Sequence, residues 1–179
     1  SYLYVSERSR FYPKILKSQG ARIGFTLTTL KLEEIKGSFD YTSKYKDFEE
    51  TRKDDVFIFQ PAIYELEFNY VSDVRKRINF GSGIEYSSGI NEQFDENFNE
   101  IQLDLYSLFR VSDKFKIEFG ISNGLSNNEI GYVYNDNDNI YFGNRKVKFM
   151  ENNLSLNYNF NSYKSLELKF RQFWSSALY

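Results

Sequence analysis

The sequence contains no cysteine, no histidine and no long apolar run. Without cysteine there are no disulfides and no thiolate chemistry, and the location can be either cytosolic or extracytoplasmic. Without histidine the chain lacks the usual general base and the commonest metal ligand. No run of 18 apolar residues occurs, so no transmembrane helix is predicted.

An excess of charge of one sign is also missing. The 23 basic and 25 acidic residues nearly cancel, so nothing indicates nucleic acid as a partner. The 179 residues suffice for one domain with a sizeable core. The first residues, Ser1 and Tyr2, are neither an initiator methionine nor a signal peptide, so the chain is expected to be a processed product or, preferably, a fragment of a longer one.

Aromatic residues, in contrast, are abundant: the chain has 18 Phe and 15 Tyr although its mean hydropathy is only −0.58. Many of them belong to an alternation of apolar and polar residues, which is clearest over 153–174. A period of two places successive side chains on opposite faces of a β-strand. Pairing Phe160 with Leu166 would put the apolar rows of both arms on one face. The stretch therefore predicts a hairpin with one apolar and one polar face.

The same alternation recurs through residues 21–179, which are predicted to form one β-domain, whereas residues 1–20 are expected to be an irregular lead-in or a broken strand. No helical period is found. Another predicted pairing, Tyr70 with Val74, would set Glu67 opposite Arg77 on the polar face. Short turns are expected near 31–34, 71–73, 112–114 and 162–164. Long polar loops are expected near 46–55, 88–98 and 123–146.

Each predicted strand thus has a polar and an apolar row. The polar residues singled out as facing a water-filled lumen are Glu65, Glu67, Arg75, Arg77, Asp104, Arg110, Glu118, Lys169 and Arg171. The apolar residues singled out as facing lipid are Leu66, Phe68, Ile78, Phe80, Leu103, Leu105, Phe109, Ile117, Phe119, Leu154, Leu156, Leu166, Leu168 and Phe170.

The polar rows decide between two kinds of barrel. Inside a small dry barrel each unpaired ion would cost several kcal/mol, whereas in a wet lumen it would cost little. Alternating short turns and long loops, and Tyr and Trp near strand ends, are typical of outer-membrane barrels. The predicted fold is therefore all-β: an antiparallel up-and-down transmembrane β-barrel of about eight strands, alone or as part of a larger barrel.

An alternative satisfies the charges equally well. A flat or sandwiched sheet could keep its charged row in bulk water, as in a soluble extracytoplasmic glycan-binding module. A third hypothesis is the non-catalytic part of a surface hydrolase.

Specific chemistry is weakly indicated. Asn135–Asn139 begins like a calcium loop, but Ile140 replaces the required Gly and Lys146 the required Glu, so an EF-hand is excluded. Cation binding by Asp136 and Asp138 is weighed against a solvated loop, which is preferred. Adjacent acidic pairs such as Glu49-Glu50 could suggest glycoside hydrolysis, which uses two carboxylates. Neighbouring side chains on a strand or turn point apart, however, so these pairs do not favour it. We expect no catalytic residue, no metal and no cofactor.

Three ordered segments carry a resemblance to a known family: Ile140–Arg145, Asn152–Asn161 and Leu166–Ser175, followed by Tyr179. They resemble "IFGRR", "L-x-Y-x-F-N" and "R-x-Y-W-S" segments in the C-terminal barrel domain of an uncharacterised family of Bacteroidota outer-membrane proteins. Tyr70–Arg77 is similar to that family's "SDYRK" turn. Those proteins carry an N-terminal module like family-9 carbohydrate-binding domains, and nothing here matches that module.

Two positions depart from the family pattern: Asn144 stands where Arg is frequent, and Phe173 where Tyr is frequent. The resemblance implies a late part of a larger barrel in the outer membrane of a Gram-negative cell envelope. Its implied partners are membrane lipids and, further, carbohydrate or other outer-membrane proteins. The expected role is a segment of a pore, a transporter or a surface anchor, and no catalytic residue can be carried over.

Overall fold

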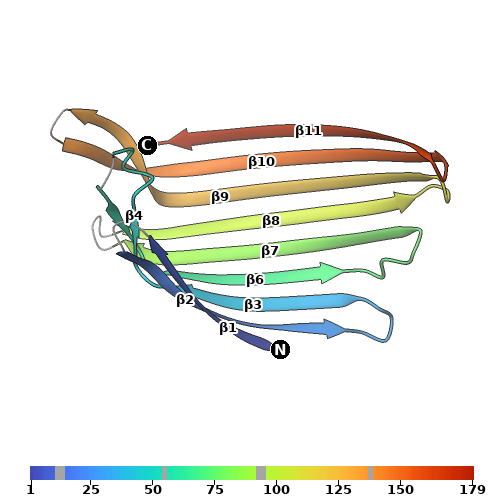
Figure 1. The fold of residues 1–179 in the computed structure, drawn as a ribbon, viewed down its shortest axis with the longest axis horizontal. Helices are drawn as coiled ribbons and strands as arrows, with labels where there is room; N and C mark the ends of the chain where they lie inside the picture. The colour runs from blue at the N-terminus through green and yellow to red at the C-terminus, as the bar shows by residue number, and fades with distance from the viewer. Residues whose placement is uncertain (11–14, 54–55, 92–95, 137–138) are drawn as a thin grey trace.

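The computed structural model describes residues 1–10, 15–53, 56–91, 96–136 and 139–179. They form a nine-stranded antiparallel sheet and a separate two-stranded hairpin (Figure 1). The strands of the large sheet, in spatial order, are β1 (Tyr2–Arg10), β2 (Ile15–Thr28), β3 (Glu34–Thr42), β6 (Ile63–Val71), β7 (Ile78–Asn91), β8 (Glu96–Arg110), β9 (Phe115–Asp136), β10 (Asn139–Asn161) and β11 (Lys164–Leu178). The hairpin consists of β4 (Tyr45–Asp47) and β5 (Ile58–Gln60).

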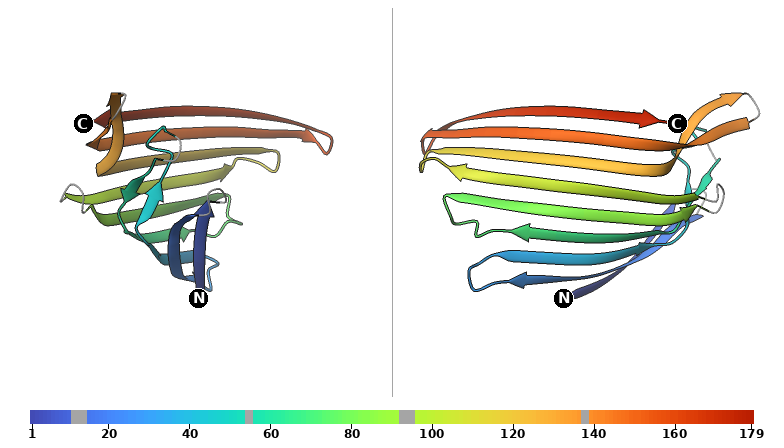
Figure 2. Two further views of the ribbon diagram at one scale, coloured as in Figure 1. Left: turned by 60° about the vertical axis from the view of Figure 1, so that its left-hand side comes forward. Right: turned by 180° about the vertical axis from the view of Figure 1, so that it is seen from behind.

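Strands that follow one another in the chain lie side by side, apart from the β4–β5 insertion between β3 and β6. The sheet bends along its length, and its two edges are β1 and β11 (Figure 2). Within the described ranges β1 pairs only with β2 and β11 pairs only with β10, so the sheet is open. The all-β, antiparallel, up-and-down prediction is confirmed to that extent. No helix in the described part of the chain is long and apolar enough to cross a membrane.

Several predicted boundaries are wrong. The sheet has nine strands rather than about eight, because residues 1–20 contain β1 and the beginning of β2. The expected loops at 88–98 and 123–146 are mostly strand: β9 and β10 run for 22 and 23 residues. Asn, Ser and Gly, which are common there, have low strand propensity, but pairing with neighbouring strands overrides it.

Two predicted registers also change. Tyr158 rather than Phe160 faces Leu166, a shift of two residues that leaves both apolar rows on one face. The turn predicted at 71–73 extends to Arg77, so Tyr70 faces Ser82, and Glu67 lies opposite Glu85 instead of Arg77.

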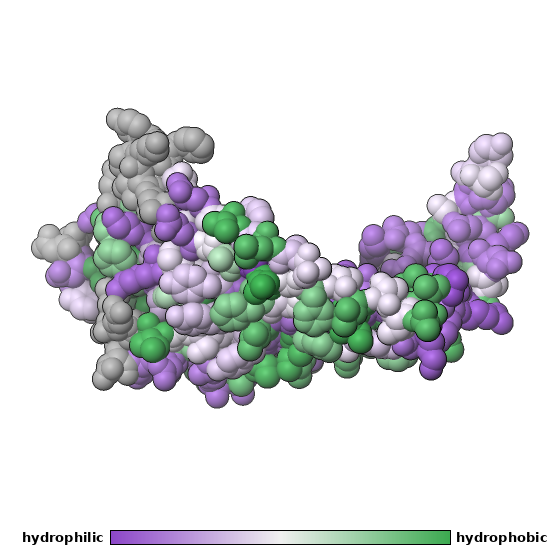
Figure 3. Space-filling view, turned by 90° about the horizontal axis from the view of Figure 1, so that it is seen from below, coloured by the Kyte–Doolittle hydropathy of each residue, from purple (hydrophilic) through white to green (hydrophobic). Residues whose placement is uncertain are grey.

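Exposure along β6 and β8 is opposite to that of an ordinary globular protein, whereas the edge strand β11 is exposed on both faces. In β6, Leu66 and Phe68 are 56% and 48% exposed, whereas the neighbouring Glu65 and Glu67 are half-buried. The register places every apolar residue that was predicted to face lipid on this same exposed face. In Figure 3 hydrophobic side chains lie mainly over the middle of the molecule, and hydrophilic ones gather toward both ends.

The molecule consequently has little conventional core. Ile58 and Ile130, at 7% and 4% exposure, are the buried large apolar residues in the described part of the chain. The accessible surface is 12535 Å², against about 9,100 Å² expected for a globular protein of this mass. The sheet therefore presents an apolar face that no other part of the described chain covers.

On the polar face, Tyr106 lies between two glycines, because Gly81 and Gly120 are its register partners in β7 and β9. A Cβ atom at Gly81 would come within 2.1 Å of the Tyr106 ring, whereas one at Gly120 would meet nothing closer than 3.9 Å. The ring thus covers Gly81 and leaves Gly120 open, which is a means of fixing strand register.

We expect Gly81→Ala to lower the free energy of unfolding by about 1–3 kcal/mol, because the new methyl group displaces the Tyr106 ring. Gly120→Ala is the matched control and should be neutral, and Gly81→Ala combined with Tyr106→Ala should lose less than the two single changes added together. Urea titration of the parent, the three single variants and the double variant measures these free energies of unfolding. Equal losses at the two glycines would refute the packing described.

Candidate functional site

The polar face carries a charge cluster that spans three adjacent strands. Arg22 on β2 donates from Nε to Asp40 on β3 at 2.6 Å. Its Nη2 lies 3.4 Å from Glu67 and 3.6 Å from Glu65, both on β6. The register puts Arg22, Asp40 and Glu65 in one row across the sheet. One guanidinium therefore serves three carboxylates.

Farther across the same face the acidic excess grows. Gln102 and Ser122 donate hydrogen bonds to Asp104. The side chains of Glu85 and Glu100 form no ion pair or hydrogen bond with any residue that the structure describes. Carboxylates that lack a cation partner must remain hydrated or find a cation from outside, since a dry environment would penalise their charge. This face therefore requires water.

The hairpin β4–β5 crosses over one end of the polar face and reaches β9 and β10 (Figure 1). Glu50 accepts the backbone N–H of Tyr132 at 2.8 Å, and Arg52 lies over the Tyr132 ring at 4.4 Å. Arg145 on β10 pairs with Glu129 at 2.5 Å and lies 3.7 Å from Glu50. Of the solvated loop predicted at 46–55, residues 48–53 do form a turn in which Glu49, Arg52 and Lys53 are exposed. The prediction is wrong for 46–47, which belong to β4, and for Glu50, which contacts the sheet.

The hairpin is also ordered internally. The hydroxyl of Thr51, which is 1% exposed, lies 2.9–3.3 Å from the carbonyl oxygens of Phe48, Lys53 and Val56. Asp47 accepts the backbone N–H groups of Glu49 and Glu50. The density of charge suggested a loop without order. The segment is ordered because the side chains of Asp47 and Thr51 form hydrogen bonds with its backbone groups.

A polar hollow of about 390 Å³ lies beside the hairpin. Tyr45, Asp47, Glu50, Glu100 and Glu129 are among the residues that line it. Burial raises the pKa of the Tyr45 hydroxyl, with nearby Asp47 adding to the effect. Carboxylates and a phenol of this kind suit a cation or sugar hydroxyls. The described residues include no group of three or more side chains able to hold a metal ion, and Asp138, weighed above as a cation ligand, lies outside them.

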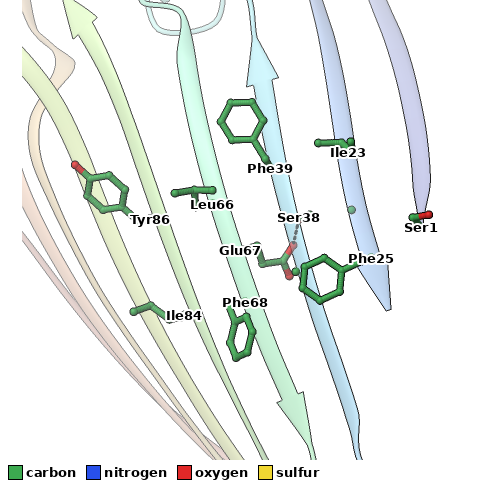
Figure 4. Close-up of a pocket in the computed structure, with 12 residues that line it drawn as sticks. Ser1, Ile23, Phe25, Ser38, Phe39, Leu66, Glu67, Phe68, Ile84 and Tyr86 are labelled. Carbon is green, nitrogen blue, oxygen red and sulfur yellow. Dashed lines mark hydrogen bonds between the residues drawn. The ribbon is translucent and has the colours of Figure 1, made fainter. Parts of the chain in front are cut away.

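The opposite face carries an apolar hollow of about 670 Å³ that is open to the outside. Side chains from β2, β3, β6 and β7 line it, among them Phe25, Phe39, Leu66, Phe68 and Ile84 (Figure 4). Glu67, which the register puts on the other face of β6, accepts a hydrogen bond from Ser38 (Figure 4). The sheet wall is therefore apolar on one side and ionic on the other within a single layer of backbone.

Most of the polar residues predicted from sequence lie together on the ionic face. The strand residues there are Glu65, Glu67, Asp104, Arg110, Glu118, Lys169 and Arg171. Sequence reasoning did not single out Arg22, Asp40, Glu50 or Arg145. The alternation already placed Arg22 and Asp40 in polar rows, whereas nothing in the sequence indicates that Glu50 meets Arg145.

Arg75 and Arg77 were predicted on a strand, and this is wrong: both lie in the turn between β6 and β7. Arg75 forms a two-point contact with Asp73, with both distances 3.0 Å. Arg77 donates to the carbonyl of Val111 at 2.8 Å, and Arg110 donates to that of Lys76 at 2.6 Å. Arg77 and Arg110 thus join the β6–β7 turn to the end of β8 and the turn that follows it.

The whole of residues 1–179 matches the family described as "Domain of unknown function (DUF5916)". The chain belongs to the DUF5916 family. A comparison of this DUF5916 chain with curated proteins found no match, and neither did one with solved structures. The predicted membership of an uncharacterised family is thus confirmed, while the match carries no statement about activity.

The turn of the DUF5916 chain should be sensitive to acid. Hydrogen bonds from Arg75 lower the pKa of Asp73 to about 2. Because the folded-state pKa lies below the unfolded one, the stabilisation is complete above about pH 4 and is lost as the pH falls toward 2. Asp73→Asn should therefore be less stable than the parent at pH 7, and the difference should shrink as the pH falls through about 2. Urea titrations across this range check it, and a difference that does not depend on pH would contradict it.

The Arg145 contacts should hold the hairpin in place. Arg145→Gln leaves Glu129 and Glu50 without their cation, so trypsin should cleave after Lys46, Arg52 or Lys53 on the order of tenfold faster. Arg171→Gln is the control, because its ion pair with Glu151, at 2.6 Å, is on the edge strand. Mass spectrometry of the fragments gives the rates. The hairpin would not depend on Arg145 if both variants were cut alike.

Proposed function

We propose that this chain forms part of the wall of an outer-membrane β-barrel, with its apolar face toward lipid and its ionic face toward a water-filled interior. The observation that carries the proposal is the reversed exposure: large apolar side chains are exposed while carboxylates between them are half-buried. In water such a face would be an uncovered apolar patch. In a bilayer it is the stable arrangement.

The length of the apolar rows supports a membrane-spanning role. Outward rows that are apolar apart from one polar residue each, Ser82, Ser107 and Gln172, extend over nine positions in β7 (78–86), in β8 (101–109) and in β11 (166–174). Nine residues span about 30 Å, and a tilt of 35–45° reduces this to roughly 21–25 Å along the membrane normal. An outer-membrane barrel has an apolar band about 25 Å high. The rows therefore match one bilayer crossing.

Aromatic residues near the ends of these rows agree with the same placement. Tyr86 and Trp174 lie near the same end of the outward rows of β7 and β11, followed on that face by Ile90 and Leu178, and are 44% and 50% exposed. At the other end, Tyr158 contacts the rings of Phe115 and Phe160. Such rings suit the interface between lipid tails and head groups. The open apolar hollow between β2 and β7 would be filled by acyl chains.

The proposed role is therefore structural: a pore, transporter or anchor segment whose interior stays wet because its carboxylates need water. The hairpin β4–β5 would narrow one end of that interior. The resemblance of 140–179 to barrel domains of Bacteroidota outer-membrane proteins supports this location, and it extends the proposal to a parent protein with a carbohydrate-binding module. Lipids are the proposed partners, and carbohydrate or other outer-membrane proteins are further ones.

Adjacent residues on opposite faces of β8 test the sidedness. In bilayers, Leu103→Arg should destabilise the protein by about 2–4 kcal/mol because it puts a charge among lipid tails. Gln102→Arg should be nearly neutral because it faces Asp104, Glu85 and water. Urea unfolding in liposomes measures both.

The soluble alternative predicts a different result. If the chain folds as a monomer in buffer without detergent and tolerates Leu103→Arg, the exposed apolar face is not a lipid surface. The membrane proposal then fails and a soluble glycan-binding module becomes the better account.

A further inference from the structure

The two edges of the sheet carry information that the proposed function does not use. β11 pairs with β10 along one side, and no described strand lies along its other side. At the opposite edge β1 pairs with β2 only as far as Gly24, which leaves 25–28 of β2 without a partner on that side. Both edges thus present free backbone N–H and C=O groups.

In a lipid bilayer these groups must be paired. An unsatisfied backbone group costs several kcal/mol in hydrocarbon, so sheets that cross membranes close into barrels. β11 is 15 residues long and alternates apolar and polar residues over 166–171, so it cannot be a soluble edge if its neighbours span the membrane. Something must therefore lie along it.

The directions of the strands exclude direct closure. Nine strands joined by antiparallel pairs leave the first and the last running the same way. Joining β11 to β1 would make a parallel pair in an otherwise antiparallel wall, and bacterial single-chain barrels have an even number of antiparallel strands. An odd number of additional strands is needed between the two edges.

The same directions exclude closure by copies of this chain. Copies inserted in the same orientation present β1 and β11 edges that all run the same way, so every contact between copies would be parallel. An antiparallel contact would require one copy to be upside down in the membrane. Ring formation from several identical sheets is therefore excluded on the same ground.

We infer that β11 is covered by a strand from outside residues 1–179, antiparallel to it, and that an odd number of such strands completes the wall. This inference rests on the proposed membrane function. The covering strand must place apolar residues beside Leu166, Leu168 and Phe170 and polar residues beside Lys169 and Arg171, since a strand in this wall shares both faces. The inner row of β11 also carries Glu167, and both cations are already paired, Lys169 with Glu167 at 3.1 Å and Arg171 with Glu151 at 2.6 Å, so polar residues of either sign suit the positions opposite them.

Hydrogen exchange on the full-length polypeptide in liposomes tests the cover directly. Half of the β11 amides point away from β10. We expect them to exchange as slowly, within about tenfold, as the amides of β7, which has a partner on each side. Fast exchange confined to that half of β11 would overturn the inference.

Cysteine cross-linking tests the exclusion of direct closure, since residues 1–179 contain no cysteine. Leu154→Cys with Phe170→Cys is the control pair, because these residues face each other, and it should form a disulfide. Leu3→Cys combined in turn with Phe170→Cys, Gln172→Cys or Trp174→Cys should form none, within one chain or between chains. A β1–β11 disulfide would overturn the inference.

These outcomes are separable from failure of the proposed function. A protein that does not enter liposomes removes the membrane role itself. A protein that enters them, yet exchanges quickly along β11 or cross-links β1 to β11, keeps that role and loses only the additional strands.

Discussion

The carboxylates of the ionic face must stay hydrated while the side chains between them avoid water, and one layer of backbone has to satisfy both demands. Glu85 and Glu100 have no cation partner among the described residues, and Arg22 is shared by Asp40, Glu65 and Glu67. Burying that row under a second layer would leave charges uncompensated at several kcal/mol each. The absence of a conventional core follows from keeping this row wet, and in the proposed membrane wall the need for closed edges follows as well.

The ends of the wall are organised differently from its middle. β9 and β10, at 22 and 23 residues, are about twice as long as a bilayer crossing needs. Their far ends carry Glu129, Tyr132 and Arg145, which receive the β4–β5 hairpin. At the opposite end the turns are short, and Arg77 and Arg110 tie two of them together through backbone carbonyls. One end is thus compact and the other carries the structure that could act on solutes.

How much of this could be predicted from the sequence depends on the range of the interaction. The period of two identified the apolar and ionic faces correctly, since the face of Leu66 or Glu118 follows from its position in its own strand. It did not predict that β7 begins at Ile78, because Asp73 and Arg75 extend the preceding turn. Nor did it predict the hairpin, since the contact of Glu50 with Tyr132 joins residues 82 positions apart. Polar stretches such as 123–136 resembled loops because they are rich in Asn, Ser and Gly. What makes them strands is their pairing with neighbouring strands, which the stretch itself does not reveal.

The single tryptophan offers the most direct measurement of the central claim. Trp174 lies on the apolar face, 50% exposed, and is the one Trp in the sequence. Its fluorescence should be quenched strongly by phospholipids brominated on their acyl chains and only weakly by iodide in the water. Strong quenching by iodide together with no effect of the brominated lipids would contradict the account.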